Sequence, residues 1–225
     1  MNDYQNKKTA LIAGGTSGLG LSLAILLSKE FNVIITGRNN PEKKELNFFY
    51  LDLLSGSLDK DIDNFLGKKG KVDLFVYSAG FYQEGLLDEI DDKGIQSMVQ
   101  IGISAPAMII RRILKKQGSL NGFIAITSTS QTRPRLKEPM YTSIKAGFGM
   151  LANSLSLDSR IGKVLVAAPG GMDTPFWRGV DRGKMLNPDE VAKEIMGLYE
   201  GSFKYKHAFI LRDPNRIKVE EIRKE

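Results

Sequence analysis

Three residues in the second half of the chain have side chains and a spacing that suit acid–base chemistry on a carbonyl group. Tyr141 and Lys145 are four positions apart in a segment with apolar residues at helical spacing, so a helix would place both on one face. A phenol has a pKa of about 10, and a neighbouring ammonium favours the phenolate, so the pair could bring a proton donor toward neutral pH. Ser128 ends a short apolar run upstream, and its hydroxyl could hold a carbonyl oxygen beside the phenol. Alone the pair is weak evidence, because a surface helix with a tyrosine and a solvated lysine has the same spacing.

A second pattern lies near the N-terminus. The apolar run Thr9 to Ala13 precedes a glycine-rich turn, and the apolar segment Leu21 to Leu27 follows it, which predicts a strand, a tight turn and a helix. Gly14, Gly18 and Gly20 would let the chain turn sharply, leave room for a pyrophosphate and pack the helix against the sheet. The helix N-terminus would offer amide donors and a positive dipole end to phosphates. A turn that only connects a strand to a helix is the alternative.

With both patterns in one chain, the sequence resembles the short-chain dehydrogenase/reductase family, whose motifs are T-G-x-x-x-G-x-G near the start and S…Y-x-x-x-K in the second half. The resemblance extends from about Lys7 to Asn215. It implies that a reduced nicotinamide delivers hydride to a carbonyl carbon while Tyr141 gives a proton to the oxygen. It also implies that Ser128 orients that oxygen, and that Lys145 lowers the pKa of Tyr141 and binds the nicotinamide ribose. No metal is required by this chemistry.

The resemblance also implies where the cofactor lies. Arg38 follows Gly37 at the end of the second predicted strand, where an acid would select NAD and an arginine favours the 2′-phosphate of NADP. We therefore expect NADP(H), with NAD(H) as the alternative if Arg38 is an ordinary surface residue. Asp52 would contact the adenine amino group or cap the following turn. The expected cofactor contacts are Gly14, Thr16, Ser17, Gly18, Leu19, Gly20, Arg38, Asp52, Ala79, Gly80, Tyr141, Lys145, Pro169, Gly170, Met172 and Thr174.

The chain departs from the family's pattern near the expected nicotinamide. Tyr77 and Ser78 replace the two asparagines of the family's N-N-A-G sequence. Gly102 stands where the family often has an asparagine, which holds a water and supports a proton relay through the lysine. Either Gln100 or Ser104 takes over the role of this asparagine, or turnover is slow. A dinucleotide-binding regulatory or scaffold protein with little or no catalysis is therefore the alternative function. Retention of the serine, tyrosine and lysine favours an enzyme.

The substrate, a small carbonyl or alcohol compound, is expected over the nicotinamide. The segment Pro175 to Leu186 is predicted to form a lid, and its aromatic residues could instead serve hinge packing or a subunit contact. The expected substrate contacts are Phe81, Gln131, Phe176, Trp177 and Arg178.

Composition narrows the function classes. The 225 residues, 42% of them hydrophobic, suit a single domain with one sizeable core. Without cysteine the chain has no disulfide, thiol nucleophile or thiolate metal site, and its one histidine, His207, is expected to be structural. The net charge of +6 raises nucleic acid as a partner, but the basic residues are scattered, so we expect none. With no signal peptide and no long apolar run, we expect a soluble cytoplasmic protein without a membrane partner.

Apolar strands alternate with helices along the chain, which predicts a doubly wound α/β (Rossmann) fold with a parallel sheet of about seven strands. The tail Arg216 to Glu225 is expected to be frayed or packed at a subunit contact. A homodimer or homotetramer is plausible through the long central helix and the Tyr141 helix, where Gly147, Gly149 and Ala152 would permit close contact or pack on the chain's own sheet. The predicted strands are 9–13, 32–36, 47–51, 72–77, 122–127, 163–167 and 208–211, and the predicted helices are 19–29, 58–66, 91–117, 140–158 and 188–199.

Overall fold

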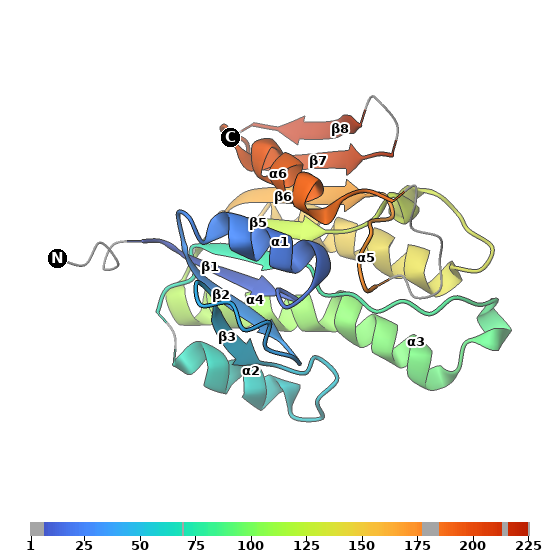
Figure 1. Ribbon diagram of the computed structural model, residues 1–225, viewed down its shortest axis with the longest axis horizontal. Helices are drawn as coiled ribbons and strands as arrows, with labels where there is room; N and C mark the ends of the chain where they lie inside the picture. The colour runs from blue at the N-terminus through green and yellow to red at the C-terminus, as the bar shows by residue number, and fades with distance from the viewer. Residues whose placement is uncertain (1–6, 69, 177–184, 213–215, 225) are drawn as a thin grey trace.

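One central sheet organises the chain (Figure 1). The computed structural model describes residues 7–68, 70–176, 185–212 and 216–224. Within them the strand order is β3-β2-β1-β4-β5-β6-β7-β8. The strands are β1 (Thr9–Ala13), β2 (Asn32–Gly37), β3 (Asn47–Tyr50), β4 (Leu74–Tyr77), β5 (Leu120–Ile126), β6 (Ile161–Pro169), β7 (Tyr205–Ile210) and β8 (Ile217–Arg223). The predicted doubly wound architecture is confirmed.

The strand order reverses beside β1, which fixes where a ligand can bind. β1 pairs in parallel with β2 on one side and with β4 on the other, so Ala13 lies between Thr36 and Tyr77. After β1 the chain passes to one face of the sheet, and after its neighbour β4 it passes to the other face. This divergence opens a crevice at the carboxyl ends of the two strands. The glycine turn after β1 and the loop after β4 both enter this crevice.

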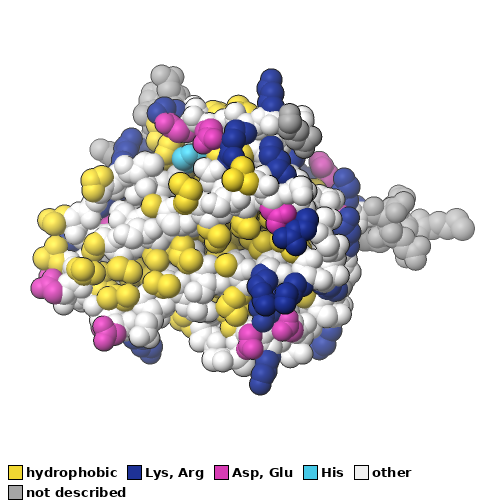
Figure 2. Space-filling view, turned by 180° about the vertical axis from the view of Figure 1, so that it is seen from behind, with side chains coloured by type: hydrophobic (Ala, Val, Ile, Leu, Met, Phe, Trp, Pro, Cys, Tyr) yellow, Lys and Arg dark blue, Asp and Glu magenta, His cyan; other side chains and the backbone are white. Residues whose placement is uncertain are grey.

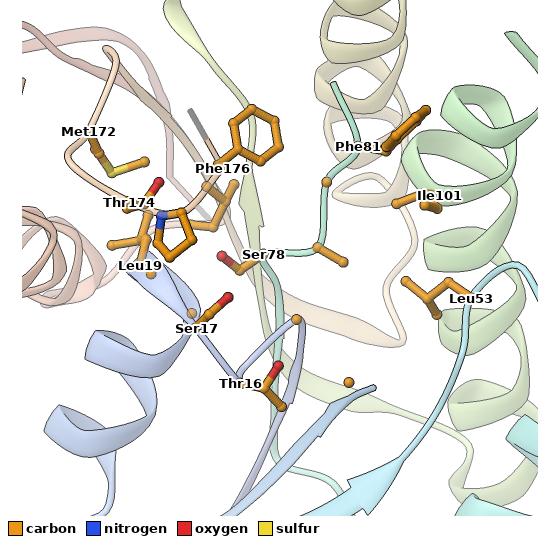
Figure 3. Close-up of a pocket in the computed structure, with 18 of the residues that line it drawn as sticks. Thr16, Ser17, Leu19, Leu53, Ser78, Phe81, Ile101, Met172, Thr174 and Phe176 are labelled. Carbon is orange, nitrogen blue, oxygen red and sulfur yellow. The ribbon is translucent and has the colours of Figure 1, made fainter. Parts of the chain in front are cut away.

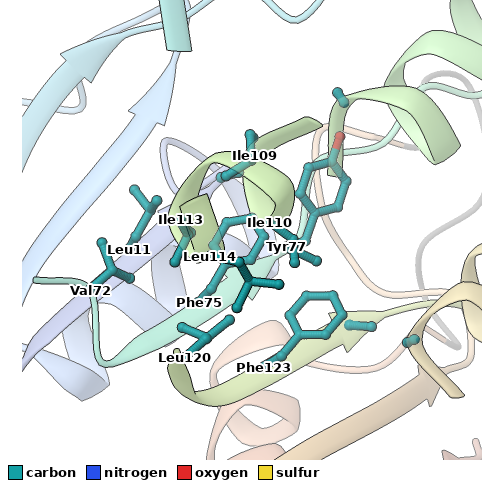
Figure 4. Packing of buried hydrophobic residues seen from close by; sticks show 14 of the residues in the cluster. Leu11, Val72, Phe75, Tyr77, Ile109, Ile110, Ile113, Leu114, Leu120 and Phe123 are labelled. Carbon is teal, nitrogen blue, oxygen red and sulfur yellow. The ribbon is translucent and has the colours of Figure 1, made fainter. Parts of the chain in front are cut away.

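The central strands β1, β2, β4, β5 and β6 are largely buried on both sides, and helices cover both faces of the sheet. Figure 1 shows α1 and α6 on the near face, with α4 and α5 behind. Phe75 and Phe123 stack 5.6 Å apart on the α4 side of the sheet (Figure 4). The Phe148 ring of α5 lies 6.3 Å from that of Phe123, between ring centres. The helices are α1 (Gly18–Leu27), α2 (Leu58–Gly67), α3 (Asp92–Val99), α4 (Ala105–Gln117), α5 (Pro139–Leu155) and α6 (Pro188–Tyr199).

The long central helix is continuous but irregular. A π-helical turn, Gln100–Ser104, joins α3 to α4 and contains Gly102, and Pro106 lies in the first turn of α4. The predicted helix 91–117 is therefore interrupted in its regular hydrogen bonding at Gly102. By length and composition alone, the segment Asp92–Gln117 passes a test for a membrane span. The core helix of a folded domain meets the same criteria, and α4 packs its apolar side chains on the sheet.

Two expectations change at the C-terminal half. The tail forms β8, which runs antiparallel to β7, so the sheet has eight strands and the expectation of a frayed tail is wrong. On α5, two of the small residues pack against the chain itself, since a Cβ on Gly149 would lie 2.6 Å from Gln131 Oε1 and Ala152 is fully buried. Gly147 is exposed, and a Cβ there would lie 3.2 Å from Ile103 Cδ1. Contact of this helix with a second copy of the chain stays a prediction.

Candidate active site

A pocket of about 350 Å³ opens at the carboxyl ends of the parallel strands. Its walls come from the glycine turn, the loops after β2, β3 and β4, the end of β5, one face of α5, and the segment after β6 (Figure 3). All expected cofactor contacts line it, together with Ser128, Phe81 and Phe176. The sequence motifs, far apart along the chain, therefore meet in one place.

The glycine turn is shaped for close approach. Gly14 has a φ of +78°, and a Cβ there would lie 2.5 Å from the Ala79 backbone nitrogen, so only glycine fits. Ser17 is the N-cap of α1 but its side chain makes no capping hydrogen bond, and the first turn of α1 has no acidic residue. The first amides of α1 are thus available to a phosphate. Gly18, between Ser17 and Leu19, lies against Thr174, where an added Cβ would be 3.1 Å from Thr174 Cβ (Figure 3).

The far end of the pocket lies at the end of β2, where the sequence predicts the adenosine half of a dinucleotide. Gly37 is packed against Thr16, because a Cβ there would lie 2.5 Å from Thr16 Oγ1. Arg38 is exposed at the rim. Asp52 Oδ1 accepts a hydrogen bond of 3.0 Å from the Leu54 amide, so it caps the turn after β3 while also lining the pocket. Sequence reasoning did not select Leu51, Leu53 and Leu54, which form an apolar wall here.

Ser128, Tyr141 and Lys145 come together at the other end. Ser128 Oγ accepts a 3.1 Å hydrogen bond from the Ser130 amide, and the Ser128 hydroxyl is also hydrogen-bonded to Tyr141. Tyr141 is 5% exposed, and Lys145 Nζ lies 5.8 Å from its ring centre. Lys145 Nζ also donates a 3.1 Å hydrogen bond to the Ile126 carbonyl at the end of β5.

Burial dominates the titration of both residues. It raises the pKa of Tyr141 to about 12, while hydrogen bonding to Ser128 opposes this, Glu138 adds to it and Arg135 opposes it. Burial also lowers the pKa of Lys145 to about 8. The sequence predicts instead that the lysine lowers the pKa of the phenol. The physical reason for the difference is desolvation, which the spacing of two residues on a helix does not reveal.

The space beside Lys145 differs from the sequence expectation. A Cβ on Gly102 would lie 2.0 Å from Ile144 Cγ2, so the isoleucine already fills that space. The hydroxyl of Tyr77 donates to the Ile101 carbonyl in the π-helical turn. A small cavity between these residues and Lys145 is not lined by Gln100 or Ser104, the two residues that the sequence suggests as a replacement relay.

The expected substrate residues divide into three groups. Phe81 and Phe176 line the pocket, and the ring of Phe176 lies 6.2 Å from that of Tyr141. Gln131 is not among the residues that line it, and its amide nitrogen donates to His207 Nε2 on β7, so its contact with substrate stays a prediction. Trp177 and Arg178 lie outside the described residues.

Two residues beside the site lie in segments that the sequence places around the substrate, but they were not selected as site residues. Glu138, the N-cap of α5, accepts a 3.2 Å hydrogen bond from Ser130 Oγ and forms an ion pair of 3.6 Å with Arg135. The Tyr82 ring is perpendicular to the Tyr141 ring at 5.2 Å. The only sequence signal was their position next to predicted site residues.

Comparisons with known proteins agree with this geometry. The model of the short chain dehydrogenase family matches residues 8–184. A 3-oxoacyl-[acyl-carrier-protein] reductase, FabG, of Chlamydia trachomatis is 25% identical over 88% of this chain and 92% of its own. An uncharacterized oxidoreductase of Staphylococcus saprophyticus is 24% identical over 96% of this chain and 95% of its own.

Solved structures share the fold. The acetoin dehydrogenase YohF of Salmonella typhimurium has a TM-score of 0.78 at 20% identity, covering 96% of this chain and all of its own. The actinorhodin polyketide ketoreductase with NADPH has a TM-score of 0.77 at 20% identity, covering 91% of this chain and 96% of its own. The chain therefore belongs to the short-chain dehydrogenase family that its motifs resemble, and it is an NAD(P)-dependent oxidoreductase acting on CH–OH or C=O groups.

Proposed function

We propose that this oxidoreductase uses NADP(H) to interconvert a carbonyl and an alcohol, with Tyr141 as the general acid and base. The observation that carries the proposal is the convergence of Ser128, Tyr141 and Lys145 on one pocket with the glycine turn of α1. The pocket fits a dinucleotide, because Gly14 and Gly37 leave room that any side chain would fill and the α1 amides face it.

Each catalytic side chain has a distinct task. When bound, the reduced nicotinamide supplies hydride to the carbonyl carbon. Tyr141 donates its phenolic proton to the carbonyl oxygen, and Ser128 donates a hydrogen bond to the same oxygen because the Ser130 amide already fixes its Oγ. Lys145 places an ammonium near the phenolate that forms, and so stabilises it.

A preference for NADP(H) is supported by the rim around Gly37. A carboxylate at this position has no room beside Thr16, and Arg38 is free to approach a 2′-phosphate. We expect Arg38→Ala to weaken NADPH binding about tenfold or more and to leave NADH binding nearly unchanged, as measured by fluorescence titration. An equal loss for both cofactors would count against this preference.

The pocket near Tyr141 favours a substrate with an apolar or aromatic body next to its carbonyl group. Phe81 and Phe176 form this wall, and Phe176 packs 5.9 Å from Tyr82, ring centre to ring centre. The similarity to FabG makes 3-ketoacyl compounds a reasonable first choice for testing. Ketones and quinones complete the panel.

The test is oxidation of NADPH and NADH, followed by the absorbance of the reduced nicotinamide, with Tyr141→Phe beside the native protein. We expect turnover with NADPH that Tyr141→Phe lowers by about 10²- to 10⁴-fold while NADPH still binds. Full activity in Tyr141→Phe would refute the assigned role.

A second candidate is a dinucleotide-binding regulatory or scaffold protein without useful catalysis. Two observations favour it. The Ile144 side chain fills the space beside Gly102, and the Tyr77 hydroxyl donates its hydrogen bond to the Ile101 carbonyl. Tight NADPH binding without turnover on the whole panel would support this candidate over the enzyme.

Self-association through α4 and α5 is also proposed. Figure 2 shows hydrophobic side chains gathered across the face formed by α3, α4 and α5. Val99 on α3 and Met150 on α5 are 38% and 63% exposed. A homodimer through this face would cover both side chains. The molecular mass of the protein in solution shows whether this dimer forms.

A further inference from the structure

The side chain of Gln131 connects two elements that flank the catalytic residues. Gln131 lies in the short helical turn η4 (Thr129–Thr132), which directly follows Ser128. Its amide nitrogen is hydrogen-bonded to His207 Nε2 on β7. Its amide oxygen lies so close to α5 that a Cβ on Gly149 would be only 2.6 Å away. The glutamine therefore bridges β7 and the helix that carries Tyr141.

Both ends of this contact lead to the site. The Gln131 backbone amide donates a 3.0 Å hydrogen bond to the Ser128 carbonyl. On α5, Gly149 follows Lys145 by four positions and Tyr141 by eight, so the three residues share one face of the helix. A displacement of the Gln131 side chain is therefore transmitted to the serine and bears on the catalytic face of α5.

The turn itself is tightly packed. Ser128, Thr129 and Ser130 are 8%, 9% and 5% exposed. Ser128 Oγ accepts a 3.1 Å hydrogen bond from the Ser130 amide and is also hydrogen-bonded to Tyr141. The position of this hydroxyl is therefore set by the conformation of the whole turn, of which Gln131 is a part.

We propose that Gln131 and His207 form a hydrogen-bonded bridge that holds Ser128 Oγ beside the Tyr141 hydroxyl, and that protonation of His207 releases this bridge. Gln131 is then a positioning residue, which acts through Ser128 without touching the substrate. The effect on turnover rests on the proposed catalytic roles of Ser128 and Tyr141. The bridge itself does not, and it can be measured without a substrate.

The bridge requires a neutral imidazole. Because the Gln131 amide nitrogen is the donor, His207 Nε2 must be the unprotonated acceptor, with the ring proton on Nδ1. An imidazolium has a proton on both nitrogens, so it would set one N–H group against another. The Gln131 amide would then have to turn over, and its nitrogen would take the place of Oε1 beside Gly149. Proton uptake by His207 therefore opposes the observed contact.

The charges that act on His207 come from β8. Burial lowers the pKa of His207 below its ordinary value of 6.5, whereas Glu220 and Glu221 raise it. Each of these carboxylates is paired with a cation of the same strand, Glu220 with Lys218 at 2.8 Å and Glu221 with Arg223 at 3.1 Å. The imidazole is therefore neutral at pH 7, and the bridge opens only under acidic conditions.

Three uncharged residues contact the other sides of His207. Val166 of β6 is its neighbour in the sheet, the Phe209 ring lies 4.8 Å from its ring between centres, and Gln131 reaches it from η4. Between them, η4 and α5 contain one charged residue, Lys145, whose Nζ is bound to the Ile126 carbonyl at 3.1 Å. Below pH 7, the titrating group at this contact is therefore the histidine.

NMR measures the bridge directly, because His207 is the only histidine of the chain and its ring gives a single signal to titrate. Gln131→Met removes the donor and keeps a side chain of similar length. It should raise the pKa of His207, because the hydrogen bond to the neutral imidazole is lost. The matched control is Gln96→Met, an exposed glutamine on α3, which should leave the titration unchanged.

Steady-state kinetics measures the positioning role. Gln131→Met should lower kcat about tenfold and leave KM and NADPH affinity nearly unchanged, because the hydrogen bond from Ser128 matters most as the carbonyl oxygen gains charge. Gly149→Ala should act in the same way, since its methyl group displaces Gln131. Alanine is a better helix former than glycine, so this loss should occur without unfolding of the protein. The two changes together should cost little more than either alone.

The conservative change His207→Gln separates the bridge from its titration. A glutamine there can accept from Gln131 through its amide oxygen and stays uncharged at every pH. In the native protein, kcat for carbonyl reduction should fall as the histidine takes up its proton. His207→Gln should keep most of the activity at pH 7 and lack this fall.

Three outcomes would overturn the proposal. One is a His207 titration that is the same in Gln131→Met and in the native protein. Another is a raised KM with unchanged kcat in Gln131→Met, which would mean that Gln131 touches the substrate. The third is an acidic fall in kcat that persists in His207→Gln. Full activity in Tyr141→Phe would instead refute the catalytic assignment, and the titration of His207 would still decide whether the bridge exists.

Discussion

The side chain of Ile144 occupies the space that a side chain at position 102 would need. A Cβ on Gly102 would lie 2.0 Å from Ile144 Cγ2. The neighbouring carbonyl, that of Ile101, is taken by the Tyr77 hydroxyl. Lys145, one residue after Ile144, is therefore enclosed on this side and turns its Nζ to the Ile126 carbonyl. Gly102 and Ile144 thus form one packing unit.

Because Gly102 and Ile144 share space, substitutions at the two positions should not be additive. Gly102→Asn alone should lower the free energy of unfolding by about 1–3 kcal/mol, because the new side chain is forced against Ile144. Gly102→Asn combined with Ile144→Ala should recover much of this loss, as measured by urea unfolding. The control is Ile144→Ala alone, which opens a cavity and is itself destabilising by about 2–5 kcal/mol. Additive losses in the double variant would show that the two positions do not share space.

The sequence predicts the layers and the pocket well for a physical reason. The apolar strands and the glycine turn after the first strand are local signals that the fold preserves. Contacts between distant segments are not readable in this way. The Gln131 to His207 bond joins the loop after β5 to β7, and β8 depends on pairing a charged tail with β7. The charged composition of this tail conceals its strand.

Lys145 makes the stability of the cofactor-free protein depend on pH. Burial lowers its pKa from 10.5 to about 8, so between these values the unfolded chain binds a proton that the folded chain has lost. Stability contributed by this group therefore rises with pH across that window. We expect Lys145→Met to be more stable than the native protein by about 3 kcal/mol at pH 7. The difference should shrink toward pH 10.5.

Urea unfolding of both proteins at several pH values from 7 to about 10.5 measures this difference. Other lysines titrate in the same range, but they are common to both proteins and cancel in the comparison. A constant difference across the window would mean that Lys145 is not the group responsible. Turnover should be lost in Lys145→Met at every pH.

Glu138 is expected to tune the acid–base residue. After burial, its charge is a further cause of the raised pKa of Tyr141, whereas Arg135 lowers that pKa. Glu138→Gln should therefore lower the pKa of Tyr141, and the rising limb of the pH profile for alcohol oxidation should move to lower pH, since the phenolate is the base. Arg135→Gln is the matched control and should move the limb to higher pH. If the rising limb shifted in the same direction in both variants, the cause would be a structural change and not the charge of the residue.

Thr16 and Gly37 are expected to control cofactor choice together. Gly37→Asp alone should weaken both NADPH and NADH, because the Cβ would lie 2.5 Å from Thr16 Oγ1 and distort the glycine turn. Thr16→Ala removes that hydroxyl and leaves room for the carboxylate to accept from the ribose 2′-hydroxyl of NADH. The double variant should therefore bind NADH more tightly than either single variant does, while NADPH is repelled by the new charge. Fluorescence titration of the three variants with NADH and NADPH measures these affinities. If Gly37→Asp alone preferred NADH, the Thr16 side chain would not be what prevents a carboxylate at position 37 from binding the ribose.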